Sequence, residues 1–274
     1  MLGSRDYTGS QGETVKDICA DLTAETEALI AVISDIDEDT WNAPTPAEGW
    51  STKDTIVHLT ESDIIARLAV ADPDDFETHK AAMQSGKAAG MSDALGTAGQ
   101  VRTGAETLIW FRESRQAMLD ALSPLDPKTR IPWFGPSMSA LSFTTARLME
   151  TWSHGQDIAD TVGATIPATD RLRHVAHIGV GTRPWSYMNR GEPVPEGSVR
   201  VELTAPSGEL WTWNEDVSSD VVRGSAEDFC MVATQRRNLA DTDLDVSGPL
   251  AEGWMAIAQA FAGPATDTRA PHRS

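Results

Sequence analysis

The chain has 274 residues, which fits one large domain or two smaller ones, and its formal net charge at pH 7 is −19. Such an acidic chain lacks the basic face of a nucleic-acid-binding protein. It has no apolar run long enough for a membrane span and no signal-peptide pattern. We therefore expect a cytoplasmic protein, monomeric or homodimeric, without nucleic-acid or membrane partners. The two cysteines, Cys19 and Cys230, are expected to be free and buried.

Four helices are predicted in the first part of the chain, because apolar residues recur there at spacings of three, four and seven. They cover residues 14–36, 51–71, 104–122 and 142–162. Ser51 and Asp54 form a capping box at the start of the second helix, and Gly163 is a suitable C-cap for the fourth. The pattern predicts a four-helix bundle over residues 12–165.

Two irregular segments separate these helices. Residues 72–99 are rich in Asp, Gly, Ala and Lys, which predicts a flexible connection with at most a short helix, able to act as a lid. Residues 131–136 include Trp133 and Phe134 between prolines and predict an aromatic loop.

The second part of the chain, residues 166–264, is predicted to be a connecting helix followed by a small α+β domain. Two segments that alternate apolar and polar residues flank an Ala-Pro-Ser-Gly turn, which indicates a β-hairpin. The predicted elements are a helix at 169–189, strands at 198–204 and 209–214, a helix at 225–236, a strand at 244–248 and a closing helix at 249–262.

The fourth predicted helix contains Glu150 and His154, whose i, i+4 spacing places both side chains on one face, one turn apart. His58, on the second predicted helix, is a third candidate. If these helices pack side by side, the three side chains would hold a divalent metal and leave positions open for water or substrate. The alternative is an ordinary surface pair on one helix, although the apolar neighbours favour burial. An ionised Glu buried without a cation would be costly.

Other titratable residues have less specific patterns. His174 and His177 share a helix face without an acidic partner at a recognisable spacing, so we expect them in the core or at a domain interface. Asp157, three residues after His154, is placed to orient its imidazole, although it could also simply face water.

Four segments resemble a known family. W-N-A-P-T-P-A-E-G-W-S-T-K-D-T-I-V-H-L at residues 41–59 and E-T-W-S-H-G-Q-D-I-A-D at residues 150–160 resemble two signatures of the mycothiol-dependent maleylpyruvate isomerases, a family of the DinB-like metal-binding bundles. Q-R-R-N at 235–238 and G-W-M-A-I-A-Q-A-F-A-G at 253–263 resemble the small, sterol-carrier-like α+β domain of those proteins, and also a segment named for wyosine base formation.

The resemblance implies a fold, a cofactor and a reaction. It implies a DinB-like four-helix bundle in which His58, Glu150 and His154 hold a divalent metal. Zinc is the first choice, and nickel, iron or manganese suit the same ligands. In the family the metal receives mycothiol, a low-molecular-weight thiol, whose thiolate attacks an electrophilic small molecule. An arginine of the second domain binds substrate carboxylate in the relatives. Arg237, beside Arg236, matches it, unless these residues are only a solvated helix end.

Three classes of function follow. The first is a thiol-using isomerase or S-transferase that acts on a small electrophilic or carboxylate-bearing metabolite. The second is a metal-dependent hydrolase or lyase of secondary metabolism that uses metal-bound water. The third is a non-catalytic carrier of small molecules or lipids, with tryptophans of the second domain lining its pocket. The segment 72–99 and the run 174–185 depart from the maleylpyruvate isomerases and fit a subgroup without an assigned substrate, so the family's substrate is not expected here.

Overall fold

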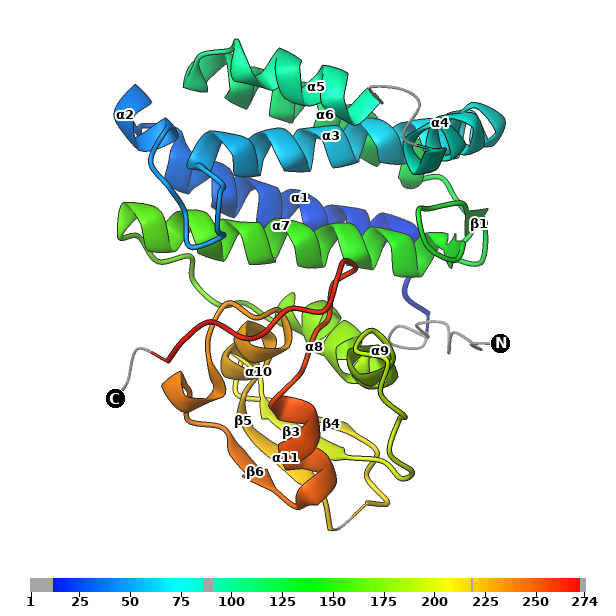
Figure 1. Ribbon diagram of the computed structural model, residues 1–274, viewed down its shortest axis with the longest axis vertical. Coiled ribbons are helices and arrows are strands. Elements are labelled where there is room, and N and C mark those ends of the chain that lie inside the picture. Colours follow the sequence, from blue (N-terminus) through cyan, green and yellow to red (C-terminus); the bar gives the residue numbers. More distant parts are fainter. Residues whose placement is uncertain (1–11, 86–90, 218, 272–274) are drawn as a thin grey trace. The chain divides into compact units, whose positions relative to one another are not determined.

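The computed structural model describes residues 12–85, 91–217 and 219–271. The protein is mostly helical with a small sheet region, and it divides into two compact units at the peptide bond between Ile166 and Pro167 (Figure 1). None of the helices in the described part of the chain combines the length and the apolar character needed to cross a membrane. Cys19 and Cys230 are free and buried, as predicted.

The first unit is built around four long helices: α1 (Val15–Ile33), α3 (Thr52–Ala71), α6 (Gly104–Leu122) and α7 (Ala140–Val162). They correspond to the four helices predicted from periodicity, and α6 begins and ends at the predicted residues. Helix α3 packs along α6 and α1 packs along α7, while α3 also contacts α7 and α1 contacts α6. Their axes run side by side in Figure 1. Buried side chains such as Leu29, Ile56 and Phe111 fill the space between them.

Local hydrogen bonds decide where these helices begin and end. The Ser51 hydroxyl accepts the N–H of Asp54 at 3.1 Å, and the Asp54 carboxylate accepts the N–H of Ser51 at 2.9 Å, which confirms the predicted capping box. Thr14 and Thr103 cap α1 and α6 in the same way. Gly163 ends α7 with a φ of 67°, a left-handed conformation that glycine adopts without strain, and it is the predicted C-cap.

One buried guanidinium joins all four long helices. Nε of Arg115, on α6, lies 2.7 Å from Oδ2 of Asp63 on α3. Its Nη1 donates to the hydroxyls of Thr26 on α1 and Thr151 on α7, at 2.5 and 3.1 Å. Because all four side chains are buried, the ion pair holds the helices at defined positions along one another.

The segment between α3 and α6 is not the flexible connection that was predicted. It forms two helices, α4 (Pro73–Ser85) and α5 (Met91–Gln100), and the residues between them lie outside the described part of the chain. Phe76 anchors α4 and is fully buried. Helix α5 approaches α3 so closely that a Cβ on Gly99 would lie 2.5 Å from a methyl group of Val57. The small residues that suggested a loop therefore allow close helix packing, and the prediction of at most one short helix was wrong.

Short elements complete the first unit. Helix α2 (Glu38–Trp41) follows α1, and a hairpin of β1 (Arg130–Ile131) and β2 (Met138–Ser139) precedes α7. The turn of this hairpin is the predicted aromatic loop. Its Trp133 stacks on the Phe76 ring of α4, with the ring centroids 5.8 Å apart.

The second unit contains a four-stranded mixed sheet with the order β4-β3-β5-β6. Strand β3 pairs antiparallel with β4 and parallel with β5, and β5 pairs antiparallel with β6. In chain order its elements are α8 (Leu172–Gly181), α9 (Arg183–Met188), β3 (Arg200–Thr204), β4 (Leu210–Trp213), β5 (Val221–Ser225), α10 (Ala226–Ala233), the short 3-10 helix Leu239–Asp241, β6 (Asp245–Ser247) and α11 (Pro249–Met255). The predicted hairpin is β3 and β4.

Three features of the second unit differ from the prediction. The helix predicted over 169–189 is two helices, because Pro184 lacks the N–H that a continuous helix would need there. The closing helix ends at Met255 rather than continuing to residue 262, since the N–H of Gln259 donates instead to the Ser186 hydroxyl at 3.0 Å. Strand β5, which pairs on both sides in the sheet, was not predicted.

Candidate metal centre

The structure brings three predicted site residues together in the first unit. Glu150 and His154 lie one turn apart on α7, and His58 reaches them from α3. The Nε2 atoms of His58 and His154 lie 3.6 and 3.5 Å from the same atom, Oε2 of Glu150. Each of the three residues has one possible ligand atom, and these three atoms all lie within 4.8 Å of one another. Among the described residues this is the one group of three or more such side chains that could hold a metal ion. The three side chains could therefore hold a metal ion.

The electrostatics of the cluster suit metal ligands. Burial by itself would raise the pKa of Glu150, but hydrogen bonds from His154 and His58 and the charge of Arg147 hold this pKa well below its usual value. Burial lowers the pKa of His58, although the hydrogen bond to Glu150 opposes this shift. The carboxylate is thus ionised and the His58 imidazole is neutral near pH 7, which are the forms that bind a cation.

Asp157 orients the second imidazole from the opposite side. Nδ1 of His154 lies 3.3 Å from Oδ2 of Asp157, whose side chain is fully buried. A carboxylate at Nδ1 favours the tautomer with its proton on that nitrogen and leaves Nε2 to face Glu150. The spacing of three residues predicts this position for Asp157.

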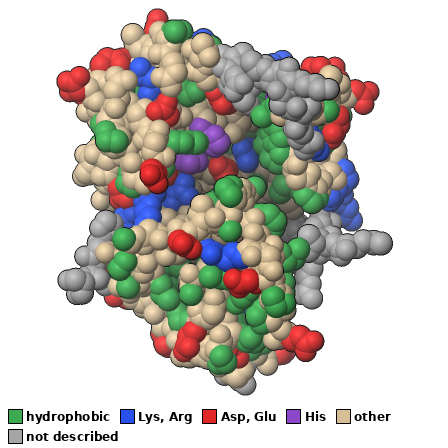
Figure 2. Space-filling model, in the orientation of Figure 1, with side chains coloured by type: hydrophobic (Ala, Val, Ile, Leu, Met, Phe, Trp, Pro, Cys, Tyr) green, Lys and Arg blue, Asp and Glu red, His purple; other side chains and the backbone are tan. Residues whose placement is uncertain are grey.

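Trp50 is a neighbour of the cluster that the sequence did not identify. Its ring centroid lies 4.8 Å from that of His58 and 5.6 Å from that of His154, and it is nearly parallel to the latter ring. No spacing rule links Trp50 to α7, because the contact exists only once α3 and α7 lie side by side. In Figure 2 histidine side chains are visible at the surface of the first unit.

The remaining candidates lie in the second unit. Arg237 follows α10, where its Nη1 donates to the backbone oxygen of Arg236 at 2.9 Å, and its role in substrate binding stays a prediction. His174 and His177 lie on α8. His174 is buried, and Nδ1 of His177 accepts a hydrogen bond from Nε1 of Trp213 at 3.2 Å. Neither histidine belongs to the cluster on α3 and α7.

Comparison with solved structures shows the fold that surrounds this site. The crystal structure of the mycothiol-dependent maleylpyruvate isomerase matches with a TM-score of 0.54, and that of a histidine-to-alanine mutant of the same protein matches with a TM-score of 0.53. Each match covers 81% of this chain and 89% of the other chain at 16% sequence identity. At this identity the likeness concerns the fold alone.

Comparison of sequences shows the family. Two uncharacterized proteins, from two strains of Mycobacterium tuberculosis, are each 42% identical to this chain over 245 residues, which is 89% of this chain and 95% of theirs. Residues 22–159, which include His58, Glu150 and His154, match the family model described as the mycothiol maleylpyruvate isomerase N-terminal domain. The chain therefore belongs to the mycothiol maleylpyruvate isomerase N-terminal domain family.

Proposed function

We propose that the protein is a metal-dependent enzyme whose divalent cation is held by His58, Glu150 and His154. The observation that carries this proposal is the pair of distances, 3.6 and 3.5 Å, from the two Nε2 atoms to one carboxylate oxygen. Ligands about 2.0–2.2 Å from a tetrahedral zinc lie roughly 3.3–3.6 Å from one another, so small side-chain shifts would complete the site. Zinc is our first choice, and nickel, iron and manganese accept the same ligands.

The residues around the ligands suit this role. With Asp157 holding the Nδ1 proton, His154 would offer the lone pair of Nε2 to a cation in place of the hydrogen bond to Glu150, and the ionised Glu150 supplies a negative charge that a bound cation would compensate. The Trp50 ring packs against both imidazoles and limits their rotation. Three protein ligands leave coordination positions open, which is the arrangement of catalytic rather than structural zinc sites.

We further propose that the enzyme uses a low-molecular-weight thiol, mycothiol in the first instance, as cosubstrate. A divalent cation at the site would lower the pKa of the thiol and supply a thiolate at neutral pH. The thiolate adds to an activated double bond of a small electrophile. Rotation about the resulting single bond and elimination of the thiolate give an isomerase, whereas retention of the new C–S bond and protonation of carbon give an S-transferase.

The structural relative is named for maleylpyruvate, a carboxylic acid, which supports a substrate that carries a carboxylate. Arg237 of the second unit is our candidate for binding it, because a guanidinium offers two parallel N–H donors to the two carboxylate oxygens. The substrate itself is proposed only as a class, a small carboxylic acid with an electrophilic double bond.

Metal analysis of the purified protein is the direct test of the site. We expect about one equivalent of metal in the wild-type protein and in His79→Ala, a histidine variant outside the cluster, and much less in His58→Ala and His154→Ala, because removing one of three protein ligands weakens coordination strongly. Equal metal content in all four proteins would place any bound ion elsewhere and contradict the proposed site.

A second measurement separates thiol use from the other functions. Mycothiol should raise the melting temperature of the zinc-loaded wild type and leave that of His58→Ala unchanged, because a ligand that binds only the folded state stabilises it. Incubation with unsaturated carboxylic acids then distinguishes the reactions: an isomerase regenerates the thiol and a transferase consumes it. Turnover without any thiol would instead indicate a hydrolase or lyase, and a protein without metal would favour a carrier.

A further inference from the structure

A second charged side chain lies on the same face of α7 as the cluster. Phe143, Arg147, Glu150, His154 and Asp157 follow one another at alternating spacings of four and three residues, which places them on one face of the helix. Arg147 lies one turn before Glu150. Toward its N-terminal end, the face that carries two of the three proposed metal ligands therefore continues with a guanidinium and then an aromatic ring.

The Arg147 side chain is buried, and no hydrogen bond from its guanidinium is found among the described residues. It is 8% exposed and its Nε makes no hydrogen bond. No ion pair joins it to a carboxylate within the described ranges of the chain. The two carboxylates whose charges act on it are engaged elsewhere, since Asp63 lies 2.7 Å from Arg115 and Glu150 faces the two imidazoles. Burial of a cation without a paired anion is costly, so folding stability does not explain this arginine.

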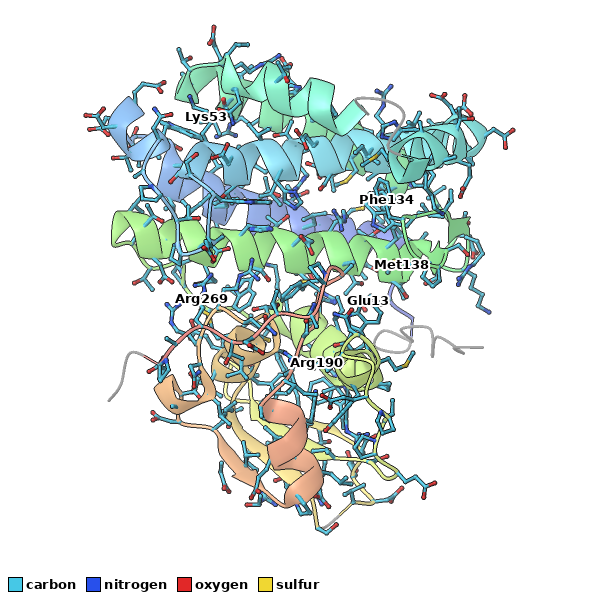
Figure 3. The ribbon with its side chains drawn as sticks, viewed as in Figure 1. Glu13, Lys53, Phe134, Met138, Arg190 and Arg269 are labelled. Atoms are coloured by element: carbon cyan, nitrogen blue, oxygen red, sulfur yellow. The ribbon has the colours of Figure 1, made fainter. Side chains whose placement is uncertain are left out.

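Aromatic rings line the guanidinium of Arg147. Its Cζ lies 5.2 Å from the centre of the Trp133 ring and 5.8 Å from that of Phe143. Phe134 and Phe76 extend this group, and Figure 3 shows Phe134 near Met138, at the hairpin end of the first unit. These rings provide cation–π contacts but no hydrogen-bond acceptor. The guanidinium of Arg147 is thus held in place by rings, and its buried Nε has no acceptor among the described residues.

We propose that Arg147 binds a carboxylate group of the small molecule that reacts beside His58, Glu150 and His154, a role that rests on the proposed function of these three residues. The planar guanidinium matches two carboxylate oxygens. A divalent cation at the neighbouring ligands would give the site a net positive charge, which favours an anion. The aromatic rings suit the apolar part of the same molecule. The ligand class is a small unsaturated carboxylic acid.

The test compares binding of maleate, an unsaturated dicarboxylate, with binding of its uncharged dimethyl ester, by calorimetry on zinc-loaded protein. We expect the wild type to bind maleate and not the ester. Arg147→Gln should bind maleate at least about tenfold more weakly because it loses the charge and the paired donors, and Arg147→Lys should be intermediate because it keeps only the charge. Arg112→Gln, an exposed arginine on α6, is the matched control and should bind as the wild type does.

Metal content, measured on the same samples, separates this proposal from the proposed metal site. It should be equal in all variants, because Arg147 is not a ligand. Wild-type maleate affinity in Arg147→Gln would overturn the role of Arg147 while the metal site stands, and so would a zinc-loaded wild type that binds no maleate. Loss of metal from both Arg147 variants would also overturn it, by making the arginine a support of the ligands.

Two further outcomes remain decisive. If the wild type binds no metal, the proposed metal site fails. The maleate affinity of the metal-free wild type, compared with that of metal-free Arg147→Gln, then tests the role of Arg147 alone. If Arg147→Gln does not fold, Arg147→Lys decides, with binding about threefold or more weaker expected from loss of the planar fork and unchanged binding overturning the proposal.

Discussion

Two buried arginines of the first unit, Arg115 and Arg147, differ in the hydrogen-bond and ion-pair partners of their guanidinium groups. Arg115 pairs with Asp63 and donates to two threonine hydroxyls, so its charge and donors are used by the fold itself. Arg147 has aromatic rings around it and a buried Nε without an acceptor. A satisfied buried ion pair fixes how helices meet. The buried Nε of Arg147, without such partners, supports the carboxylate-binding role proposed for this residue.

His177 of the second unit should make folding stability depend on pH. Burial, with the charges of His174 and Arg173, lowers its pKa from 6.5 to about 4. Between pH 4 and pH 6.5 this histidine therefore binds more protons in the unfolded chain than in the folded protein. The contribution of the neutral His177 to folding stability is complete above pH 6.5 and is lost as the pH falls toward 4. Protonation of Nδ1 would also remove the acceptor for the Trp213 indole N–H.

The measurement is urea unfolding at pH 7.5 and pH 5. We expect the urea concentration at half unfolding of the wild type to be lower at pH 5 than at pH 7.5. The decrease should be smaller in His177→Gln, because its amide does not titrate and can still accept a hydrogen bond from Trp213. An equal decrease in both proteins would mean that His177 does not contribute to the pH dependence.

At the scale of elements, the packing of α5 on α3 depends on one glycine. In a helix, Gly→Ala normally stabilises by about 0.5–1 kcal/mol. At Gly99 the new Cβ would lie 2.5 and 2.6 Å from the two methyl groups of Val57, a buried and stiff side chain. We therefore expect Gly99→Ala to destabilise the protein by about 1–3 kcal/mol, the usual cost of overpacking.

Gly135→Ala is the matched control for this change, since nothing lies within 4 Å of its added Cβ. Thermal unfolding should show a lower melting temperature for Gly99→Ala and little change for Gly135→Ala. Hydrogen exchange should be faster in α5 of Gly99→Ala. A melting temperature at or above that of the wild type would indicate that α5 does not pack on α3 as described.

The elements that could be predicted are those defined by local chemistry. Helix α6 has both a capping box and an apolar stripe within its own residues, and its ends were predicted correctly. Helices α4 and α5 were missed because small residues such as Gly99 indicate a loop unless the neighbouring helix is known. Strand β5 was missed because its pairing partners, β3 and β6, lie elsewhere in the chain, and five residues carry too little periodicity.

The same limit applies to the candidate site. His58, Glu150 and His154 could be selected because their residue types suit a metal and two of them share a helical spacing. Trp50 and Arg147 could not be selected by type, since a tryptophan usually belongs to the core and an arginine three residues before a glutamate looks like a surface pair. Only the packing of α3 beside α7, and of the hairpin beside α7, brings them next to the candidate site.

At the scale of the whole molecule, all three proposed ligands belong to the first unit, on α3 and α7, and none belongs to the second. A metal that binds only the folded state stabilises it by about 2.7 kcal/mol when its free concentration is 100 times its Kd. This stabilisation should act where the ligands are. Removal of metal with a chelator should therefore affect the two units differently.

Hydrogen exchange measured for each element can detect that difference. After chelation we expect faster exchange in α3 and α7, because the ion would reinforce their packing by joining His58 to Glu150 and His154. We expect little change in strands β3 to β6 of the second unit. Readdition of zinc should restore the protection in the wild type. In His58→Ala neither chelation nor zinc should have an effect, because the link between the two helices is missing. Unchanged exchange in α3 and α7 of the wild type would show that no ion joins these helices, and equal loss of protection in both units would show that the stabilisation does not arise at these three residues.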